Sequence, residues 1–389
     1  MRIETITPVH IGTGEKYGPI DFFIKGRTLH RVDFNRFLST LDDSQRERIL
    51  KYLEEERYAD VQRMFKDEHT RYTVELREGV IVRRIRDVRE AFKTLSGEPY
   101  IPGSSIKGSI RSGLYLYYAL PEHAKEAKEI TGINIIEELR REVRESRGRI
   151  NRKQIGETLE KKFFNVGRER DIKDAKFDLF RFVHVSDFMS EKATLHLDQI
   201  ITYSKQRNGA MREKHFSIFA ETAEGTFTGE IKLNTPALIR ALNSSEYPNL
   251  EKKLRLFGLS KEDIFSEKVQ KKFITTLIKR STISRNISYL HDLDLMGNIQ
   301  NASEVANYLM DNLPSAEGFI RLGFGVGTHF QGIIKAIEKR DPRFAAELIS
   351  QFNRIPRRKG ESGVIPPYPK TIELTSEGKP LGWMRMVIE

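Results

Sequence analysis

The chain has 389 residues, a net charge of +11 and a pI of about 9.5. This length allows two domains with a sizeable core, and the charge favours a polyanionic partner, nucleic acid before membrane. The chain contains no cysteine, which excludes disulfides, thiolate zinc sites and a cysteine nucleophile. No run approaches the length of a membrane span, and the first residues lack a signal-peptide apolar stretch, so we expect a cytoplasmic protein.

The first hundred residues combine strand patterns with one charged helical pattern. The helical pattern begins at Asp42. A basic cluster, Arg83, Arg84 and Arg86, follows the last of the strand-like runs. Those runs, which are apolar or alternate between apolar and polar residues, predict strands at residues 3–9, 20–24, 28–32 and 79–82.

A helix is predicted to begin after the Pro-Gly pair at residues 102–103, which breaks the preceding strand. Ser104 or Ser105 can cap this helix. Lys107 and Arg111 point away from its packed face, so free N–H groups, serines and cations gather where a phosphate would bind. The alternative is an ordinary capped surface helix, and the order of a Walker A loop is absent. The apolar face recurs every three or four residues, at Ile106, Ile110, Leu114 and Tyr117.

The middle of the chain is its most polar part, and strand patterns return after it. Residues 121–177 predict a charged helical insertion. Farther along, Asn208-Gly209 favours positive φ and predicts a tight turn, with cations on both of its arms. We expect this hairpin to act as a thumb that crosses bound RNA. The predicted strands of this half are residues 180–185, 199–203, 215–221 and 227–233.

Five short motifs, in order along the chain, resemble those of the RAMP superfamily, the RNA-binding subunits of CRISPR effector complexes. Single glycine-rich strings are common, whereas five in this order are specific. The chain ending, with Pro-Tyr-Pro-Lys-Thr at residues 367–371 and Leu-Gly-Trp at residues 381–383, is similar to that of the fifth Csm subunits of type III-A complexes. The five motifs occupy residues 4–24, 100–111, 178–188, 199–231 and 322–327.

With this resemblance, the element pattern predicts an α+β fold of two ferredoxin-like, RRM-like domains with a helical insertion between them. We expect a first domain at residues 1–120, the insertion at 121–177, and a second domain with the hairpin and the glycine-rich loop at 178–389. The resemblance implies a non-catalytic subunit that holds the 3′ side of the guide RNA (crRNA) at the head of the Csm filament. It would aid crRNA maturation and target RNA binding in antiviral defence.

The resemblance also implies the partners of the chain. These are crRNA and target RNA, the neighbouring Csm backbone and small subunits, and a host nuclease that trims the 3′ end of the guide. We expect no cofactor, no metal and no membrane partner. The residues expected to contact RNA lie in the glycine loops, the arginine cluster, the predicted helix and the hairpin: His10, Gly12, Thr13, Gly14, Arg83, Arg84, Arg86, Ser104, Ser105, Lys107, Arg111, Lys205, Arg207, Arg212, Arg321, Gly325, Gly327, Thr328 and His329.

Two residues are candidates for catalysis, although we favour a structural or RNA-binding role for both. His10, beside the first glycine loop, would be the acid–base of a RAMP endoribonuclease that processes guide RNA. Asp21 follows Gly-Pro-Ile, a context that resembles the catalytic aspartate of the cutting Csm subunit, but the Phe-Phe pair after it departs from that pattern. A turn role is therefore favoured for Asp21. A different alternative is an assembly protein whose basic face meets an acidic subunit without RNA.

Overall fold

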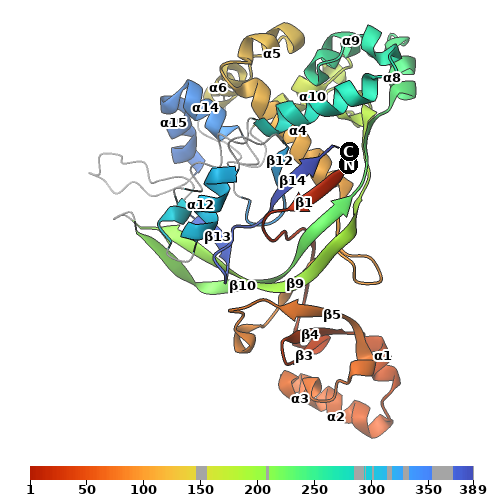
Figure 1. Cartoon of the computed structure of the whole chain (residues 1–389), viewed down its shortest axis with the longest axis vertical. Coiled ribbons are helices and arrows are strands. Elements are labelled where there is room, and N and C mark those ends of the chain that lie inside the picture. The colour runs from red at the N-terminus through yellow and green to blue at the C-terminus, as the bar shows by residue number, and fades with distance from the viewer. Residues whose placement is uncertain are drawn as a thin grey trace.

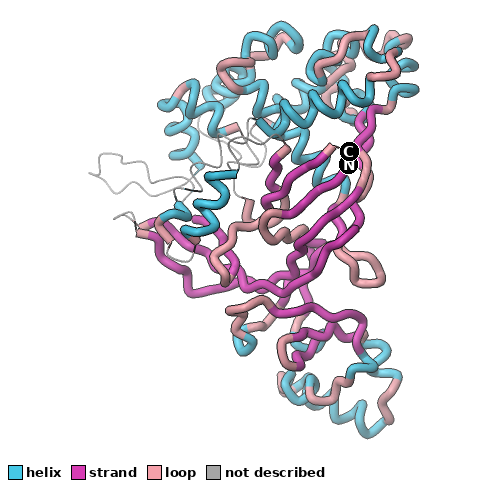
Figure 2. Tube along the Cα trace, in the orientation of Figure 1, coloured by secondary structure: helices cyan, strands magenta, loops and turns pink. Residues whose placement is uncertain are grey.

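The computed structural model describes residues 1–145, 156–206, 210–283, 293, 295–299, 302–312, 318–326, 333–352 and 371–388. In these ranges the chain is α+β, as predicted, with a large mixed sheet between a helical layer and a smaller strand–helix lobe (Figures 1 and 2). The described helices are all too short or too polar to cross a membrane.

The main sheet is organised around one long hairpin, β9 (Phe188–Lys205) and β10 (Met211–Thr228). Strand β1 (Arg2–Thr5) pairs antiparallel with β10, and β14 (Trp383–Val387) pairs antiparallel with β1. Helices α4 (Gly103–Ala119) and α10 (Val269–Ile283) follow β1 and β10 in the chain and contact each other. The strand order β14-β1-β10-β9 with these two helices corresponds to one ferredoxin-like unit.

The prediction of two consecutive ferredoxin-like domains is not confirmed. β1 lies in the expected first domain, yet its neighbours on both sides, β10 and β14, lie in the expected second domain. Both termini consequently meet beside the same sheet (Figure 1). Sequence periodicity could not reveal this arrangement, because pairing across more than two hundred residues leaves no local signal. The boundaries at residues 120 and 177 stay predictions.

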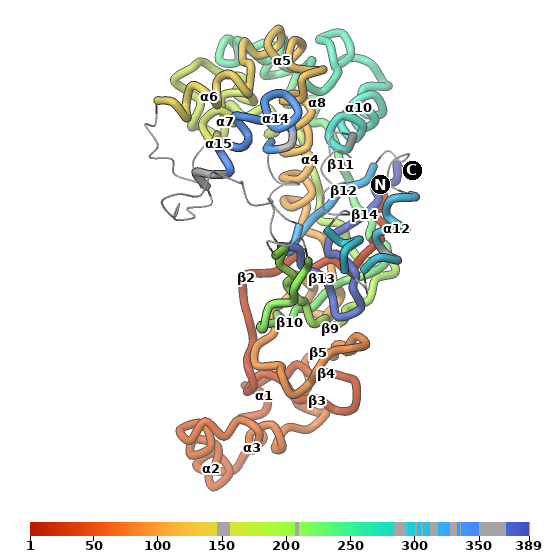
Figure 3. Tube along the Cα trace, turned by 90° about the vertical axis from the view of Figure 1, so that its left-hand side faces the viewer, coloured from red at the N-terminus to blue at the C-terminus, as the bar shows by residue number. Residues whose placement is uncertain are grey.

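A small lobe of strands and helices lies on the side of the β9–β10 hairpin opposite the helical layer (Figure 3). Its strand β5 (Thr70–Leu76) pairs parallel with β9, and β4 and β3 continue the sheet. Asp42 caps helix α2 by accepting from the Gln45 N–H at 2.8 Å, so that helix begins where the sequence predicted. The elements of the lobe are β3 (Phe22–Lys25), β4 (Thr28–Val32), α1 (Phe34–Ser39), α2 (Asp43–Glu54) and α3 (Tyr58–Gln62).

The described residues of the predicted insertion form three helices and two short 3₁₀ turns, and the second helix packs its apolar stripe into the largest hydrophobic core of the described residues. Ile135, Ile136, Leu139 and Val143 on α6 are buried there together with the apolar face of α4. The helices of this layer are α5 (Ala124–Thr131), α6 (Ile135–Glu145), α7 (Glu157–Phe164), α8 (Thr235–Leu242), α9 (Leu250–Lys253), α14 (Ile334–Arg340) and α15 (Pro342–Phe352).

Several predicted strands are shorter or absent. The strand predicted at residues 3–9 ends at Thr5, and the one predicted at 20–24 begins only at Phe22. Residues 79–82 lead into a 3₁₀ turn, η3 (Val82–Arg84), and residues 179–182 form another, because Asp178 accepts from the Phe180 N–H at 2.8 Å and starts a helical turn. Only β8 (Val183–Val185) remains extended. The other elements are β2 (Gly12–Tyr17), β6 (Val88–Ala91), β7 (Tyr100–Ile101), β11 (Ile231–Leu233), β12 (Phe319–Arg321), β13 (Thr371–Thr375) and α12 (Ser303–Asn312).

Candidate nucleic-acid interface

The N-terminus of helix α4 is occupied by a carboxylate of the same chain. The Gly103 N–H donates to Asp187 Oδ1 at 2.8 Å, while Ser104 and Ser105 lie inside the first turn and neither caps it. A Cβ at position 103 would overlap the carbonyl oxygen of Ser186, so the glycine permits close packing of α4 against β8. The predicted serine cap is therefore wrong, and the positive end of the helix already faces a negative charge.

The cations of α4 are bound inside the protein. Lys107 Nζ donates to the Val183 carbonyl at 2.8 Å, and burial lowers the pKa of Lys107. Arg111 donates to both carboxylate oxygens of Asp178 at 2.7 and 2.8 Å and to Glu160 at 2.7 Å. The prediction that Lys107 and Arg111 point away from the packed face is wrong. They connect α4 to the segment before β9 instead of facing an external phosphate.

His10 is also a structural residue. Its side chain is buried, and Nδ1 lies 2.7 Å from the Glu221 carbonyl oxygen. Burial, the largest effect, lowers the pKa of His10, so the ring is neutral at physiological pH. A Cβ at position 323 would overlap the His10 carbonyl oxygen, which also accepts from the Phe324 N–H at 2.8 Å. The first and last glycine motifs therefore pack together around His10.

The last glycine motif is tied to the chain ending. Arg321 is 2% exposed, and its Nε donates to the Leu381 carbonyl at 2.9 Å. Its guanidinium also donates to the Gly325 carbonyl at 3.2 Å and lies 5.3 Å from the Trp383 ring. Arg321 therefore stabilises this turn from inside, contrary to the expected RNA-facing position. Three more predicted contacts lie outside the described residues: Gly327, Thr328 and His329.

The first glycine motif is a strand. Gly12, Thr13 and Gly14 open β2 and are exposed to solvent. Gly12 pairs with Ala91 of β6, and the regular pairing resumes only at Lys16. Asp21 follows in a short turn, where its carboxylate accepts from the Gly18 N–H at 2.9 Å and lies 3.2 Å from Arg31. This geometry agrees with the turn role that the sequence favoured for Asp21.

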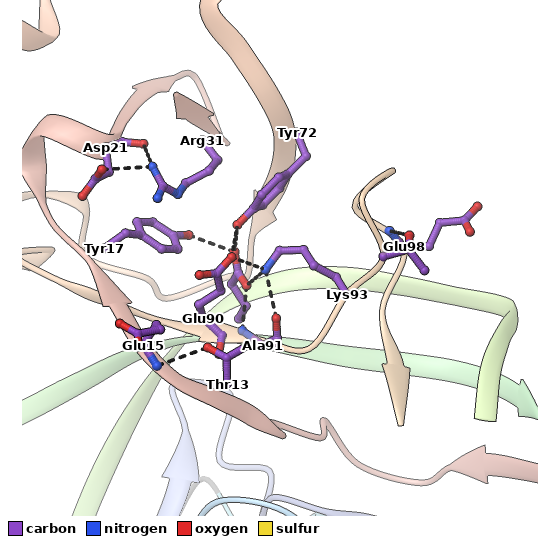
Figure 4. A network of polar contacts seen from close by, with 12 residues as sticks. Thr13, Glu15, Tyr17, Asp21, Arg31, Tyr72, Glu90, Ala91, Lys93 and Glu98 are labelled. Carbon is purple, nitrogen blue, oxygen red and sulfur yellow. Dashed lines mark hydrogen bonds and ion pairs between the residues drawn. The ribbon is translucent and has the colours of Figure 1, made fainter. Parts of the chain in front are cut away.

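A buried polar network underneath β2 was missed by the sequence analysis. The Glu221 carboxylate, 0% exposed, accepts from the Tyr17 and Tyr72 hydroxyls at 3.0 and 2.9 Å and from Lys93 Nζ at 2.6 Å. Figure 4 shows Tyr17, Tyr72 and Lys93 pointing toward one another from separate segments. Burial and the Glu221 charge raise the pKa of both tyrosines, which therefore remain neutral donors. The available signal was a glutamate directly after the apolar run Ile218-Phe219-Ala220 of β10.

The predicted hairpin exists and is longer than expected. β9 and β10 pair over most of their length, from Met211 opposite Lys205 down to Thr228 opposite Met189. Arg212 is exposed near the end of the hairpin, whereas Arg207 and the Asn208-Gly209 turn lie outside the described residues.

The arginine turn, comprising Arg83, Arg84 and Arg86, differs from the other predicted cations. All three side chains are exposed, and they form no hydrogen bond, ion pair or ring contact with any other described residue. The backbone of the turn is held in place, because the Ile81 N–H donates to Gln199 Oε1 on β9 at 3.0 Å. A fixed backbone with free guanidinium groups is well suited to phosphate contacts.

Nowhere in the described ranges do three metal-ligating side chains converge.

Comparison with known proteins identifies the family. Residues 2–330 match the model of the RAMP superfamily. The chain belongs to the RAMP superfamily. Two curated relatives of this RAMP chain bear the name CRISPR system Cms protein Csm5. The relative from Methanocaldococcus jannaschii is 24% identical over 245 residues, which cover 60% of this chain and 52% of the relative. The relative from Streptococcus thermophilus is 28% identical over 131 residues, which cover 29% of this chain and 36% of the relative.

Solved structures extend the likeness over the whole RAMP chain. A chain of a cryo-EM structure, described as a Csm-crRNA-target RNA ternary complex of a type III-A CRISPR-Cas system, matches with a TM-score of 0.71 and 22% identity, covering 99% of both chains. A crystal structure of T. onnurineus Csm5 matches with a TM-score of 0.65 and 18% identity, covering 99% of this chain and 100% of that one. The resemblance inferred from the sequence motifs is thereby confirmed, although the matched region spans only about half of the first curated relative.

Proposed function

We propose that this RAMP chain is a non-catalytic crRNA-binding subunit of a type III-A Csm complex. In this role it holds the 3′ side of the guide at the head of the filament, aids crRNA maturation and contributes to target RNA binding. The family, the names of the curated relatives and the full-length likeness to a chain of a Csm-crRNA-target RNA complex all support this assignment. Neighbouring Csm backbone and small subunits are its protein partners, and a separate nuclease trims the guide.

The arginine turn is the observation that carries the RNA-binding part of the proposal. Its three guanidinium groups are exposed and unpaired within the described part of the chain, in a protein with a net charge of +11. Because a guide-binding subunit must accept any spacer sequence, it holds RNA mainly through phosphate and 2′-hydroxyl groups. Unpaired arginines on a fixed turn provide such contacts without selecting a base sequence.

The surroundings of His10 and Asp21 support the non-catalytic part. His10 has one ring nitrogen bound to a backbone carbonyl and is buried beneath the glycine turn, where a scissile phosphate would have difficulty reaching it. The Asp21 carboxylate is committed to Gly18 and Arg31. Both side chains are therefore occupied in holding the fold.

The test is the affinity of the purified full-length chain, and of the assembled complex, for single-stranded RNAs of unrelated sequence over a range of salt concentrations. We expect similar affinities for all sequences and a steep decrease with salt. A chain that assembles normally without measurable RNA affinity would support the assembly alternative. Cleavage of repeat RNA that is lost in His10→Ala would support the endoribonuclease alternative, so both results would overturn the proposal.

A further inference from the structure

The strand β10 contains a pronounced bulge close to the turn end of the hairpin. Glu213 pairs with Tyr203 and Ser217 pairs with Ile201, so three residues of β10 lie opposite the single residue Thr202 of β9. We refer to residues 214–216, Lys-His-Phe, as the β10 bulge. Bulges turn side chains away from the regular alternation of a sheet, and they are common beside functional sites.

The bulge presents an aromatic ring to solvent, with a half-buried cation beside it. Phe216 is 58% exposed, although a large apolar side chain in the centre of a strand is ordinarily covered. Lys214 Nζ lies 5.8 Å from the centre of the Phe216 ring, so a positive charge accompanies the exposed aromatic face. His215, between them, is exposed as well.

The arginine turn lies beside this bulge. β6 runs parallel to β10 with Arg89 opposite Ala220, so the residues that precede β6 lie along β10 toward the bulge. Two hydrogen bonds connect the same elements: the Ile81 N–H donates to Gln199 Oε1 at 3.0 Å, and Gln199 Nε2 donates to the Ser217 hydroxyl at 3.0 Å. Within the described ranges, strand pairing covers this edge of β10 only from Ala220 onward.

We propose that the β10 bulge is a base-stacking site for single-stranded RNA, in which Phe216 stacks on one base while Lys214 and the arginine turn hold the adjoining phosphates. This inference rests on the proposed RNA-binding function. Aromatic rings stack on any base, so the contact increases affinity without selecting a sequence. A base that is unstacked from its neighbours exposes the π-face that such a ring requires. The exposed ring and the unpaired arginines are thereby explained by one ligand.

Phe216→Trp tests the stacking directly. The natural chain has one tryptophan, the buried Trp383, so the substitution adds a single exposed indole. Titration with mixed-sequence single-stranded RNA should strongly quench the red-shifted emission of that indole, and RNA anisotropy should show affinity at least equal to the natural chain. Unquenched emission in a chain that binds RNA normally by anisotropy would overturn the stacking site and leave the proposed function intact.

Phe216→Ala separates stacking from charge. We expect RNA affinity to fall about tenfold at every salt concentration, with an unchanged salt slope, because a stacked base is lost and no phosphate contact is removed. Phe265→Ala is the matched control, because Phe265 is 65% exposed on η8 (Glu262–Phe265) in the helical layer. The RNA affinity of this control variant should equal that of the natural chain. Thermal unfolding verifies that both variants are folded.

Two other results have distinct meanings. If Phe216→Ala leaves RNA affinity unchanged but weakens association with neighbouring subunits, the β10 edge is a protein contact and the stacking proposal is wrong. If neither the natural chain nor its complex binds RNA, the proposed function itself fails, and the stacking site fails with it.

Discussion

Helix α4 and the arginine turn both carry clustered cations, but the partners of those cations differ. Lys107 and Arg111 on α4 are bound to Val183, Asp178 and Glu160 of the same chain. The arginine turn has no such side-chain partner among the described residues, although its backbone is anchored to β9 through the Ile81 N–H. Clustered cations in the sequence therefore correspond to two different surroundings: α4 uses its cations to hold the fold, and the turn leaves its side chains free to contact a ligand, which we propose is RNA.

The largest effect is expected where an interior charge is removed entirely. Glu221→Ala should lower the free energy of unfolding by about 3–5 kcal/mol, because Lys93 keeps only the partly exposed Glu90 as a counter-charge. The Tyr17 hydroxyl and the Ala91 N–H also lose their buried acceptor. Urea unfolding at neutral pH measures this loss. The control Glu230→Ala removes a 58% exposed carboxylate that pairs with Lys232 and should cost at most about 1 kcal/mol. Equal small losses would contradict the structural role of the network.

Arg111→Ala should lower the free energy of unfolding by about 2–3 kcal/mol, since Asp178 and Glu160 each lose a charge-assisted hydrogen bond. The folded fraction should bind RNA with an unchanged salt slope. Unfolding curves and RNA titrations of the same sample measure both quantities, with Arg84→Ala as the exposed control. A stable Arg111→Ala variant with weakened RNA binding would reverse the comparison between α4 and the turn.

The triple variant R83A/R84A/R86A should have the opposite pattern. Its stability should stay within about 0.5 kcal/mol of the natural chain, because exposed side chains without partners are removed. Its log–log salt slope for single-stranded RNA should decrease by about 2, at about 0.7 for each lost phosphate contact. The control K125A/K128A/K271A removes the same net charge from exposed positions of the helical layer. An equal decrease in that control would mean that only net charge matters.

The smallest effect is a pH dependence. Burial lowers the pKa of Lys107 in the folded chain, whereas an unfolded lysine has a pKa of about 10.4. At pH values between these two pKa values, Lys107 is protonated in the unfolded chain and deprotonated in the folded chain. The contribution of Lys107 to stability should therefore rise with pH in that window and stay flat below it. Lys107→Met should make the rise shallower without abolishing it, because burial also lowers the pKa of Lys253, to about 7. The substitution should cost about 1 kcal/mol at neutral pH through the lost bond to Val183. Unfolding from about pH 8 to about pH 10 measures the difference, with the R83A/R84A/R86A variant keeping the natural slope.

Local patterns predicted the local elements well. The α+β class, the long hairpin, the helical insertion and the start of α2 at its Asp42 cap follow from periodicity, turn chemistry and capping, which act over a few residues. The pairing of β1 with β10 and β14 could not be predicted in this way. Neither strand is close to β1 in the chain, and their association depends on the shared core.

The candidate site shows the same limit at the level of side chains. The sequence correctly places cations on α4 and in the arginine turn, but it does not reveal that Asp178 and Glu160 come to meet Arg111. The sequence also does not predict the β10 bulge, because Phe216 fits the apolar pattern of a strand. The pairing register reveals the bulge, and the folded structure shows that Phe216 is exposed. Charge is a property of residue type, whereas availability for a ligand is a property of the folded neighbourhood.

The most direct measurement is RNA–protein crosslinking by ultraviolet light in the native complex, followed by mass spectrometry of the crosslinked peptides. We predict crosslinks in the peptides that carry the arginine turn and Phe216, and none in the first three turns of α4, whose cations are bound within the chain. Crosslinks at Lys107 or Arg111 without any at the arginine turn or Phe216 would contradict the assignment of these two regions.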